Sequence, residues 1–317
     1  RIGLPVFAPD GSAFAFTNET PLCTELWLGD PATGKLRRIP DLRVNNVLFE
    51  QAFVFSGQGR HLWVATIPTE RGDQPREQDV PLSPSMQESM ARTAHVATYQ
   101  DLLKDPHDEE LFKHYATSQW ACVDLLSASW HVIGEPGLFE DIQPSPDGQF
   151  LLCNRLAPPF SYRVGSWGFP RVVEVLSVMG ERLSQVAHLP LADDTPRFGV
   201  RQGYRNVMWQ AARSATLCGL QALDGTPQEA RRFRHRLTSL LWTATAGQAI
   251  VTELDRERRW RTTSLVLLDE PGRPAQVLFD RSDRDAYSHP GEFLLKAGTQ
   301  QVLQEGDMAW LSGDGAT

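Results

Sequence analysis

A short hairpin unit recurs along this chain and constrains its fold more than any other feature. Val6 to Phe16 reads V-F-A-P-D-G-S-A-F-A-F, which predicts a strand, an Asp-Gly turn and a second strand of alternating polarity. Ile142 to Leu152 reads I-Q-P-S-P-D-G-Q-F-L-L and is the same unit. Degenerate copies occupy residues 53–64, 207–220 and 241–253. An internal repeat of this kind indicates a structure built from several similar hairpins.

Several of these units are followed by a second hairpin, at residues 25–39, 120–133 and 173–186. Two hairpins make four antiparallel strands, and a four-stranded sheet repeated around an axis is the blade of a β-propeller. The turn landmarks are unevenly spaced, so some blades must carry insertions; they lie at Asp10, Gly57, Asp147, Arg213 and Gly247. A β-sandwich or another barrel also uses many short strands, but it does not repeat such a motif. We therefore predict an all-β propeller of four-stranded antiparallel blades.

Composition and charge argue against several functional classes. The 317 residues include 31 Lys and Arg against 39 Asp and Glu, and the net charge of -8 argues against a dedicated nucleic-acid binder. No apolar run approaches the roughly 20 residues that a membrane-spanning helix needs. The four cysteines lie far apart without a C-x-x-C pair, and no phosphate-binding glycine motif occurs. We predict no metal site, no cofactor and no membrane or nucleic-acid partner.

Residues 68–119 interrupt the strand pattern. The segment is polar and rich in Pro and Gln before it becomes helical. Asp105 is placed as an N-cap, Pro106 occupies the first helical position, and Leu111 and Tyr115 fall on one helix face. We predict an insertion that contains a short helix and either binds a ligand or braces neighbouring blades.

Several stretches closely resemble the β-propeller region of the glutamyl endopeptidases, which are serine peptidases of the prolyl oligopeptidase family. T-I-P-T-E-R-G-D-Q-P begins at Thr66, and T-Y-Q-D-L-L-K-D-P-H-D-E-E-L-F-K-H-Y-A-T-S-Q begins at Thr98. Further matches are P-F-S-Y at 159–162, H-L-P-L-A-D-D-T-P at 188–196 and L-F-D-R-S-D-R-D-A-Y-S-H-P-G at 278–291. The matches follow the family's order over nearly the whole chain.

The resemblance implies a seven-bladed propeller stacked on an α/β-hydrolase domain that follows it in sequence. That domain would carry a Ser-His-Asp triad and need no cofactor, while the propeller would admit peptides and exclude folded proteins. We therefore expect residues 1–317 to be the propeller and the hydrolase domain to be absent. The blade that starts at Val6 is expected to lack a strand, and the rim facing the hydrolase is expected to expose an apolar patch.

The chain has no convincing catalytic residue of its own. The nearest match to a G-x-S-x-G nucleophile elbow is V-G-S-W-G at 164–168, but Ser166 has neither the first glycine nor a following helix. His107 and His114 lack metal-ligand spacing and are interpreted as solvated surface. His289 precedes Pro-Gly and is interpreted as part of a turn.

Two arginine-rich runs are the strongest local charges. They are R-R-F-R-H-R at 231–236 and R-E-R-R-W-R at 256–261. An arginine there that faced the central cavity would attract an acidic peptide side chain, and Arg259 is our candidate. A solvated strand or turn is the simpler interpretation, and RNA binding through arginine and Trp260 ranks third.

The family-like stretches supply three further candidates for substrate contact: Tyr162, Arg163 and Arg201. Arg205 shares the V-R-Q-G-Y-R stretch with Arg201 but lies two residues before a predicted strand, so a tie between blades is the alternative to substrate contact. Gly168 stands where the family more often has a basic residue before Phe-Pro. If that residue contributes to the family's preference for acidic substrates, the resemblance does not carry glutamyl specificity over to this chain.

The function predicted from the sequence is substrate gating by a non-catalytic propeller of a serine endopeptidase. Its partners would be the parent's hydrolase domain and peptide substrates. The alternative is a stand-alone propeller that acts as a protein-interaction scaffold. The compartment stays open among the bacterial periplasm or exterior, the cytoplasm and, for a plant protein, the plastid.

Overall fold

The computed structural model describes residues 1–57, 59–77, 99–195, 201, 203–221, 231–285, 287, 289–297 and 299–313. Four sheets are four-stranded, antiparallel and connected in chain order. The first contains β1 (Val6–Phe7), β2 (Phe14–Glu19), β3 (Thr24–Gly29) and β4 (Leu36–Arg38). The second contains β5 (Phe53–Phe55), β6 (His61–Thr66), β7 (Ser118–Asp124) and β8 (Trp130–Gly137). The predicted all-β class is confirmed.

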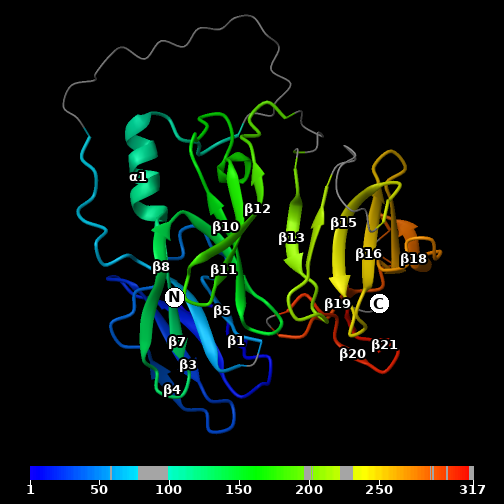
Figure 1. Cartoon of the computed structure of the whole chain (residues 1–317), viewed down its shortest axis with the longest axis horizontal. Coiled ribbons are helices and arrows are strands. Elements are labelled where there is room, and N and C mark those ends of the chain that lie inside the picture. Colours follow the sequence, from blue (N-terminus) through cyan, green and yellow to red (C-terminus); the bar gives the residue numbers. More distant parts are fainter. Residues whose placement is uncertain are drawn as a thin grey trace, which may run out of the picture.

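The remaining sheets continue this order along the chain (Figure 1). The third contains β9 (Phe139–Pro144), β10 (Phe150–Leu156), β11 (Arg171–Ser177) and β12 (Arg182–Leu189). A two-stranded sheet follows, with β13 (Arg205–Trp209) and β14 (Leu217–Leu220). The next four-stranded sheet contains β15 (Arg236–Trp242), β16 (Gln248–Asp255), β17 (Trp260–Leu267) and β18 (Gln276–Ser282). The last residues pair β19 (Glu292–Phe293) with β22 (Leu311–Ser312), and β20 (Gln304–Glu305) with β21 (Met308–Ala309).

The first blade contains four strands, so the expectation that the blade beginning at Val6 would lack one was wrong. Two residues suffice for its inner strand because Val6 and Phe7 pair with Ala15 and Phe14. The preceding residues extend this edge, since Ile2 bridges to Asn18.

One backbone turn recurs from blade to blade. In the first unit, the N–H of Ala8 donates to the oxygen of Ala13, and the N–H of Gly11 donates to the oxygen of Ala8. The same pair of bonds starts from Ser56, Ser145 and Lys296, and variants start from Gln210 and Thr243. The five landmark turns predicted from the sequence are therefore confirmed. The turn at Lys296, in K-A-G-T-Q-Q, is a sixth that was not predicted from the sequence.

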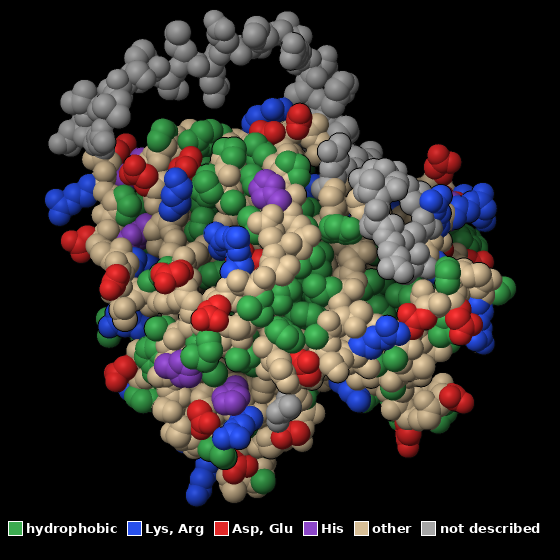
Figure 2. All heavy atoms as spheres, viewed as in Figure 1, with side chains coloured by type: hydrophobic (Ala, Val, Ile, Leu, Met, Phe, Trp, Pro, Cys, Tyr) green, Lys and Arg blue, Asp and Glu red, His purple; other side chains and the backbone are tan. Residues whose placement is uncertain are grey.

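The core is largest under the first three sheets. One cluster of buried residues runs from Ala8 to Leu176 and includes Phe55, Trp63 and Trp120. A second cluster joins the third sheet to β13 through residues such as Leu189 and Val207. Figure 2 shows apolar side chains gathered over the same region of the surface. Burial between consecutive sheets thus holds the blades together.

Helix α1 (Pro106–Ala116) braces the third blade. Asp105 caps it by accepting a 2.9 Å hydrogen bond from the N–H of Asp108, as predicted. Phe112 packs edge-on against Phe160 and Phe169, with ring centroids 5.4 and 5.8 Å away. Residues 78–98 of the predicted insertion lie outside the described residues. Among the described helices, none is long and apolar enough to cross a membrane.

Candidate functional site

Two adjoining cavities are lined largely by residues of the inner strands and of the repeated turns, and together we call them the axial channel. One has a volume of about 1010 Å³, and its walls include residues of β9, β13 and β15. The other has a volume of about 970 Å³ and is lined by residues of five of the six repeated turns. The cavities adjoin because they share Phe49, Gln51, Asp141, Gln143 and Gln300. We call them the helix-end cavity and the turn-end cavity, because α1 and the turn at Ser56 lie at opposite ends of β6.

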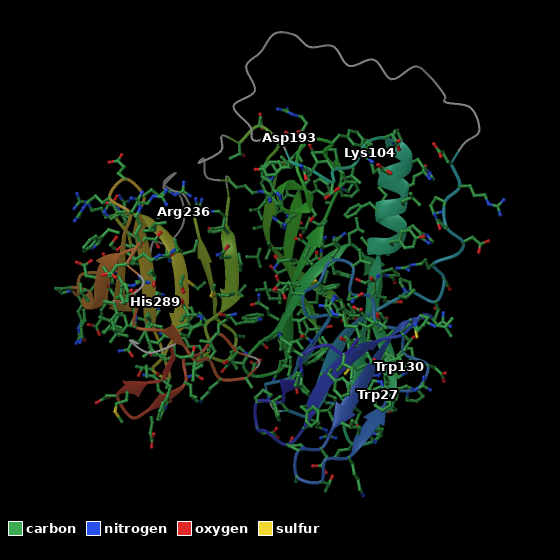
Figure 3. All side chains as sticks on the ribbon, turned by 180° about the vertical axis from the view of Figure 1, so that it is seen from behind. Trp27, Lys104, Trp130, Asp193, Arg236 and His289 are labelled. Atoms are coloured by element: carbon green, nitrogen blue, oxygen red, sulfur yellow. The ribbon has the colours of Figure 1, made fainter. Side chains whose placement is uncertain are left out.

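The helix-end cavity is charged. Its lining includes four arginines and three acidic residues, namely Arg171, Arg201, Arg205, Arg236, Glu50, Glu140 and Asp141. Figure 3 shows Arg236 toward the end of the molecule that also carries Lys104 and Asp193. The turn-end cavity is instead walled largely by apolar side chains, among them Val6, Phe53, Phe55, Pro144, Trp209 and Leu295.

Two of the arginines serve as structural ties. Arg171 donates from Nε and Nη2 to the two carboxylate oxygens of Glu140, which is the bidentate geometry that guanidinium favours. Arg201 donates to the backbone oxygens of Trp167, Phe169 and Pro190. Burial and, second, the nearby charge of Arg171 lower the pKa of Arg201 to about 10. Arg201 therefore fixes the loop between β10 and β11 to the segment after β12.

Arg205 and Arg236 have no such ties. Among the described residues, neither side chain makes a hydrogen bond or an ion pair, and the Nε atom of Arg205 is buried without a partner. Burial and, second, the charge of Arg236 lower the pKa of Arg205. Of the two roles considered for Arg205, the structure shows no tie between blades; Arg201, in the same family-like stretch, makes that connection.

The buried carboxyl of Asp141 lies on the same cavity wall. Burial raises its pKa, although the Nε2 atom of Gln143 donates a 2.6 Å hydrogen bond to Asp141 Oδ2. Glu140 is already paired with Arg171. With four arginines against three acidic residues, the lining of the helix-end cavity carries one more basic than acidic side chain.

Of the four substrate-contact candidates, only Arg201 lines the cavity. Tyr162 is exposed and donates a 3.3 Å hydrogen bond to Glu109 on α1, while burial of its hydroxyl and the charge of Glu109 raise its pKa. Arg163 is exposed beside it, and Arg259 lies in the turn between β16 and β17. Contact of any of them with substrate stays a prediction.

The segment around Ser166 forms no nucleophile elbow. Ser166 begins a single 3-10 turn, Ser166–Gly168, and its backbone oxygen accepts from Phe169 and Arg171. Within the described ranges, no serine hydroxyl is hydrogen-bonded to a histidine imidazole, since the one histidine contact, at Ser56, comes from the backbone N–H of His61, and no three His, Cys, Asp or Glu side chains form a metal-binding group. His289 accepts from the N–H of Gly291 in a turn, consistent with its predicted role.

The two basic runs have different surroundings. In the second, Arg261 pairs with Asp283, and Arg258 lies over the ring of Trp260 at 5.4 Å. In the first, Arg236 reaches the axial cavity. The sequence suggested that one arginine of these two runs faces the central cavity, and Arg259 was the candidate chosen for that role. The missed signal was position: Arg236 begins the strand that leads into a repeated turn, and that strand is the inner one of its blade.

Fold and cavity together define a β-propeller with an axial channel. Comparison with curated proteins adds two relatives, both named "Probable glutamyl endopeptidase, chloroplastic". The protein from Oryza sativa subsp. japonica is 30% identical over 361 residues, covering all of this chain and 38% of the relative. The protein from Arabidopsis thaliana is 29% identical over 360 residues, covering all of this chain and 37% of the relative. Over its whole length, this chain is therefore homologous to part of the glutamyl endopeptidases.

No family model matches the chain. Among solved structures, an acylaminoacyl peptidase from Pyrococcus horikoshii aligns with a TM-score of 0.46 and 10% identity, covering 84% of this chain and 37% of that one. The β-propeller domain of the Trilobed protease from Pyrococcus furiosus aligns with a TM-score of 0.44 and 8% identity, covering 88% of this chain and 71% of that one.

Proposed function

We propose that this chain is the substrate-gating propeller of a serine endopeptidase and that the catalytic triad lies in an α/β-hydrolase domain of the same protein. The observation that carries the proposal is the axial channel formed by the two adjoining cavities. The homology supports it, because the chain spans just over a third of the curated relatives.

The dimensions of the inner strands suit a gate for extended peptides. β9 has six residues, and an extended strand rises about 3.3 Å per residue, so the wall it forms is about 20 Å long. An extended peptide segment of similar length would lie along it. A folded domain of about 100 residues has a radius of gyration near 13 Å and would not fit a cavity of about 1010 Å³.

We also propose that the hydrolase domain docks at the helix end. Three aromatic side chains there are more than a third exposed: Tyr99, Tyr162 and Trp167. Tyr99 and Trp167 pack edge to face, with ring centroids 5.2 Å apart. Exposed aromatic clusters of this kind favour a protein interface.

Gating is tested by narrowing the channel in the full-length protein. Gln51 and Gln300 are exposed and line both cavities, so Gln51→Trp and Gln300→Trp would obstruct the channel with little disturbance of the core. Gln185→Trp, on the exposed outer strand β12, is the matched control. We expect the two channel variants to lower kcat/KM several-fold for a long unstructured peptide and much less for a dipeptide ester.

Equal effects on the long and short substrates, or an equal effect of Gln185→Trp, would overturn gating. A full-length protein without peptidase activity would instead favour the interaction scaffold. The isolated chain is expected not to hydrolyse a Glu-containing chromogenic peptide. Hydrolysis that was lost on Ser166→Ala would place the active site in this chain and contradict the proposal.

A further inference from the structure

Arg205 and Arg236 come from consecutive units and line the same cavity. Arg205 begins β13 and Arg236 begins β15, the inner strands of their units. The pairing of β13 with β14 shifts after Arg205, where Asn206 has a φ of 48°. A bulge of this kind redirects the neighbouring side chains of a strand. The local backbone thus departs from regular pairing at the residue that carries the unpaired guanidinium.

Arg205 is half-buried and Arg236 is exposed, and neither has an acceptor of the kind that several other arginines of the described residues have. Arg171 is paired with Glu140, Arg213 with Asp269, and Arg261 with Asp283. The Nε of Arg205 is buried without an acceptor, as is the Nε of Arg201, but Arg205 has none of the hydrogen bonds that Arg201 makes through its Nη atoms. The only charged neighbour with an effect on the ionisation of Arg205 is another arginine. An unmade hydrogen bond of a buried charged group is costly, and an anion at this position would remove that cost.

We propose that Arg205 and Arg236 form a carboxylate-binding subsite in the channel wall, which holds an acidic side chain of a peptide that lies along the channel. Two guanidinium groups offer forked N–H donors that match carboxylate oxygens. The identity of the ligand as a peptide rests on the proposed gating function. The subsite itself rests on the unpaired charges and on the shared cavity.

The test uses the purified 317-residue chain and two fluorescein-labelled unstructured peptides of equal length, one with glutamates and one with glutamines at the same positions. Binding is measured by fluorescence anisotropy. We expect Arg205→Gln and Arg236→Gln each to weaken binding of the glutamate peptide by about tenfold and to leave the glutamine peptide unchanged. Arg205→Lys should recover only part of the loss, because lysine keeps the charge but loses the fork.

Arg43→Gln is the matched control, since Arg43 is an exposed arginine that lines neither cavity. Added salt should weaken glutamate-peptide binding more in the wild type than in the Arg205→Gln, Arg236→Gln double variant. Circular dichroism of each variant confirms that the fold is kept. If Arg205→Gln and Arg236→Gln weaken glutamate-peptide binding no more than Arg43→Gln does, the attraction comes from the surface charge as a whole, and the subsite is overturned.

Full binding of the glutamate peptide by the double variant would also overturn it. If the double variant binds normally while Gln51→Trp and Gln300→Trp still discriminate against long peptides, the gating function stands and only the subsite falls. If the tryptophan variants also fail to discriminate, both proposals fall.

Discussion

The two ends of the axial channel are built from the same inner strands but differ in what repeats. At the turn end, one backbone turn recurs in unit after unit and surrounds an apolar wall. At the helix end, the lining is charged, and an arginine begins the inner strand in only two consecutive units, at Arg205 and Arg236. A feature repeated in every blade serves the fold that the blades share. A residue that only one or two units carry is the better candidate for function.

The comparison also separates two kinds of arginine at the helix end. Arg201 makes three hydrogen bonds to backbone oxygens, and Arg171 is paired with a carboxylate. The side chains of Arg205 and Arg236 make no hydrogen bond or ion pair with any other described residue. Stability and ligand binding should therefore respond to different members of this one cluster.

The largest effect is expected at the turn end. Phe55 is 1% exposed within the main core cluster, so Phe55→Ala should lower the free energy of unfolding by about 3–5 kcal/mol. Phe7 is 44% exposed and provides the control, since Phe7→Ala removes little buried surface. Denaturant unfolding measures both. Similar losses for the two variants would show that the turn-end wall is not the stabilising part of the molecule.

The next effect distinguishes Arg201 from Arg205. Arg201→Met leaves three carbonyl oxygens without their donor and should lower the free energy of unfolding by about 1–3 kcal/mol. Arg205→Met removes an unsatisfied charge and should change stability by less than about 0.5 kcal/mol or increase it. Thermal unfolding of the pair provides the measurement. The reverse order would contradict the division between structural and ligand-binding arginines.

A smaller effect is expected in the repeated turn itself. Gly148 has a φ of 72° with open space around its Cα, so Gly148→Ala introduces backbone strain alone, worth about 1 kcal/mol. Gly272 is equally open but lacks the positive φ, and Gly272→Ala should be neutral or slightly stabilising. Chemical denaturation of both variants compares them. If Gly148→Ala and Gly272→Ala were equally stable, the positive φ of the repeated turn would not be the reason for glycine at position 148.

The smallest effect concerns acid. The N–H and hydroxyl of Ser12 donate to Asp10 and hold the pKa of that carboxyl below its usual value of 3.8. A lowered pKa in the folded state means that the stabilisation is present above pH 3.8 and disappears as the pH falls through the lower folded value. Asp10→Asn should therefore flatten the stability profile below about pH 4. If Asp10→Asn leaves the dependence of stability on pH unchanged, Asp10 does not contribute to the loss of stability in acid.

Sequence reasoning located the fold better than the site, and particular residues show why. The Asp-Gly turns at Asp10 and Asp147 have local chemistry that determines a hairpin, so the repeated units could be predicted. The sixth turn, at Lys296, makes the same backbone bonds with different residues and carried no such signal.

The site depends on which side chains are paired, and that is a property of tertiary structure. Arg201 and Arg205 are four residues apart in one family-like stretch, and nothing local distinguishes them. Arg201 donates hydrogen bonds only because the fold brings the backbone oxygens of Trp167, Phe169 and Pro190 within reach of its guanidinium group. Arg259 lies in the turn between β16 and β17 and lines neither cavity, whereas Arg236 of the first basic run does line one.

The central claim is that peptides lie along the axial channel, and site-specific photo-crosslinking tests it most directly. A benzophenone amino acid is placed in turn at Gln300, which lines both cavities, and at Gln185 on the outer strand β12. We predict that a labelled acidic peptide crosslinks at position 300 with a yield that saturates and is competed by unlabelled peptide, with only background yield at position 185. Equal yields at the two positions, or crosslinking at position 185 alone, would contradict the account.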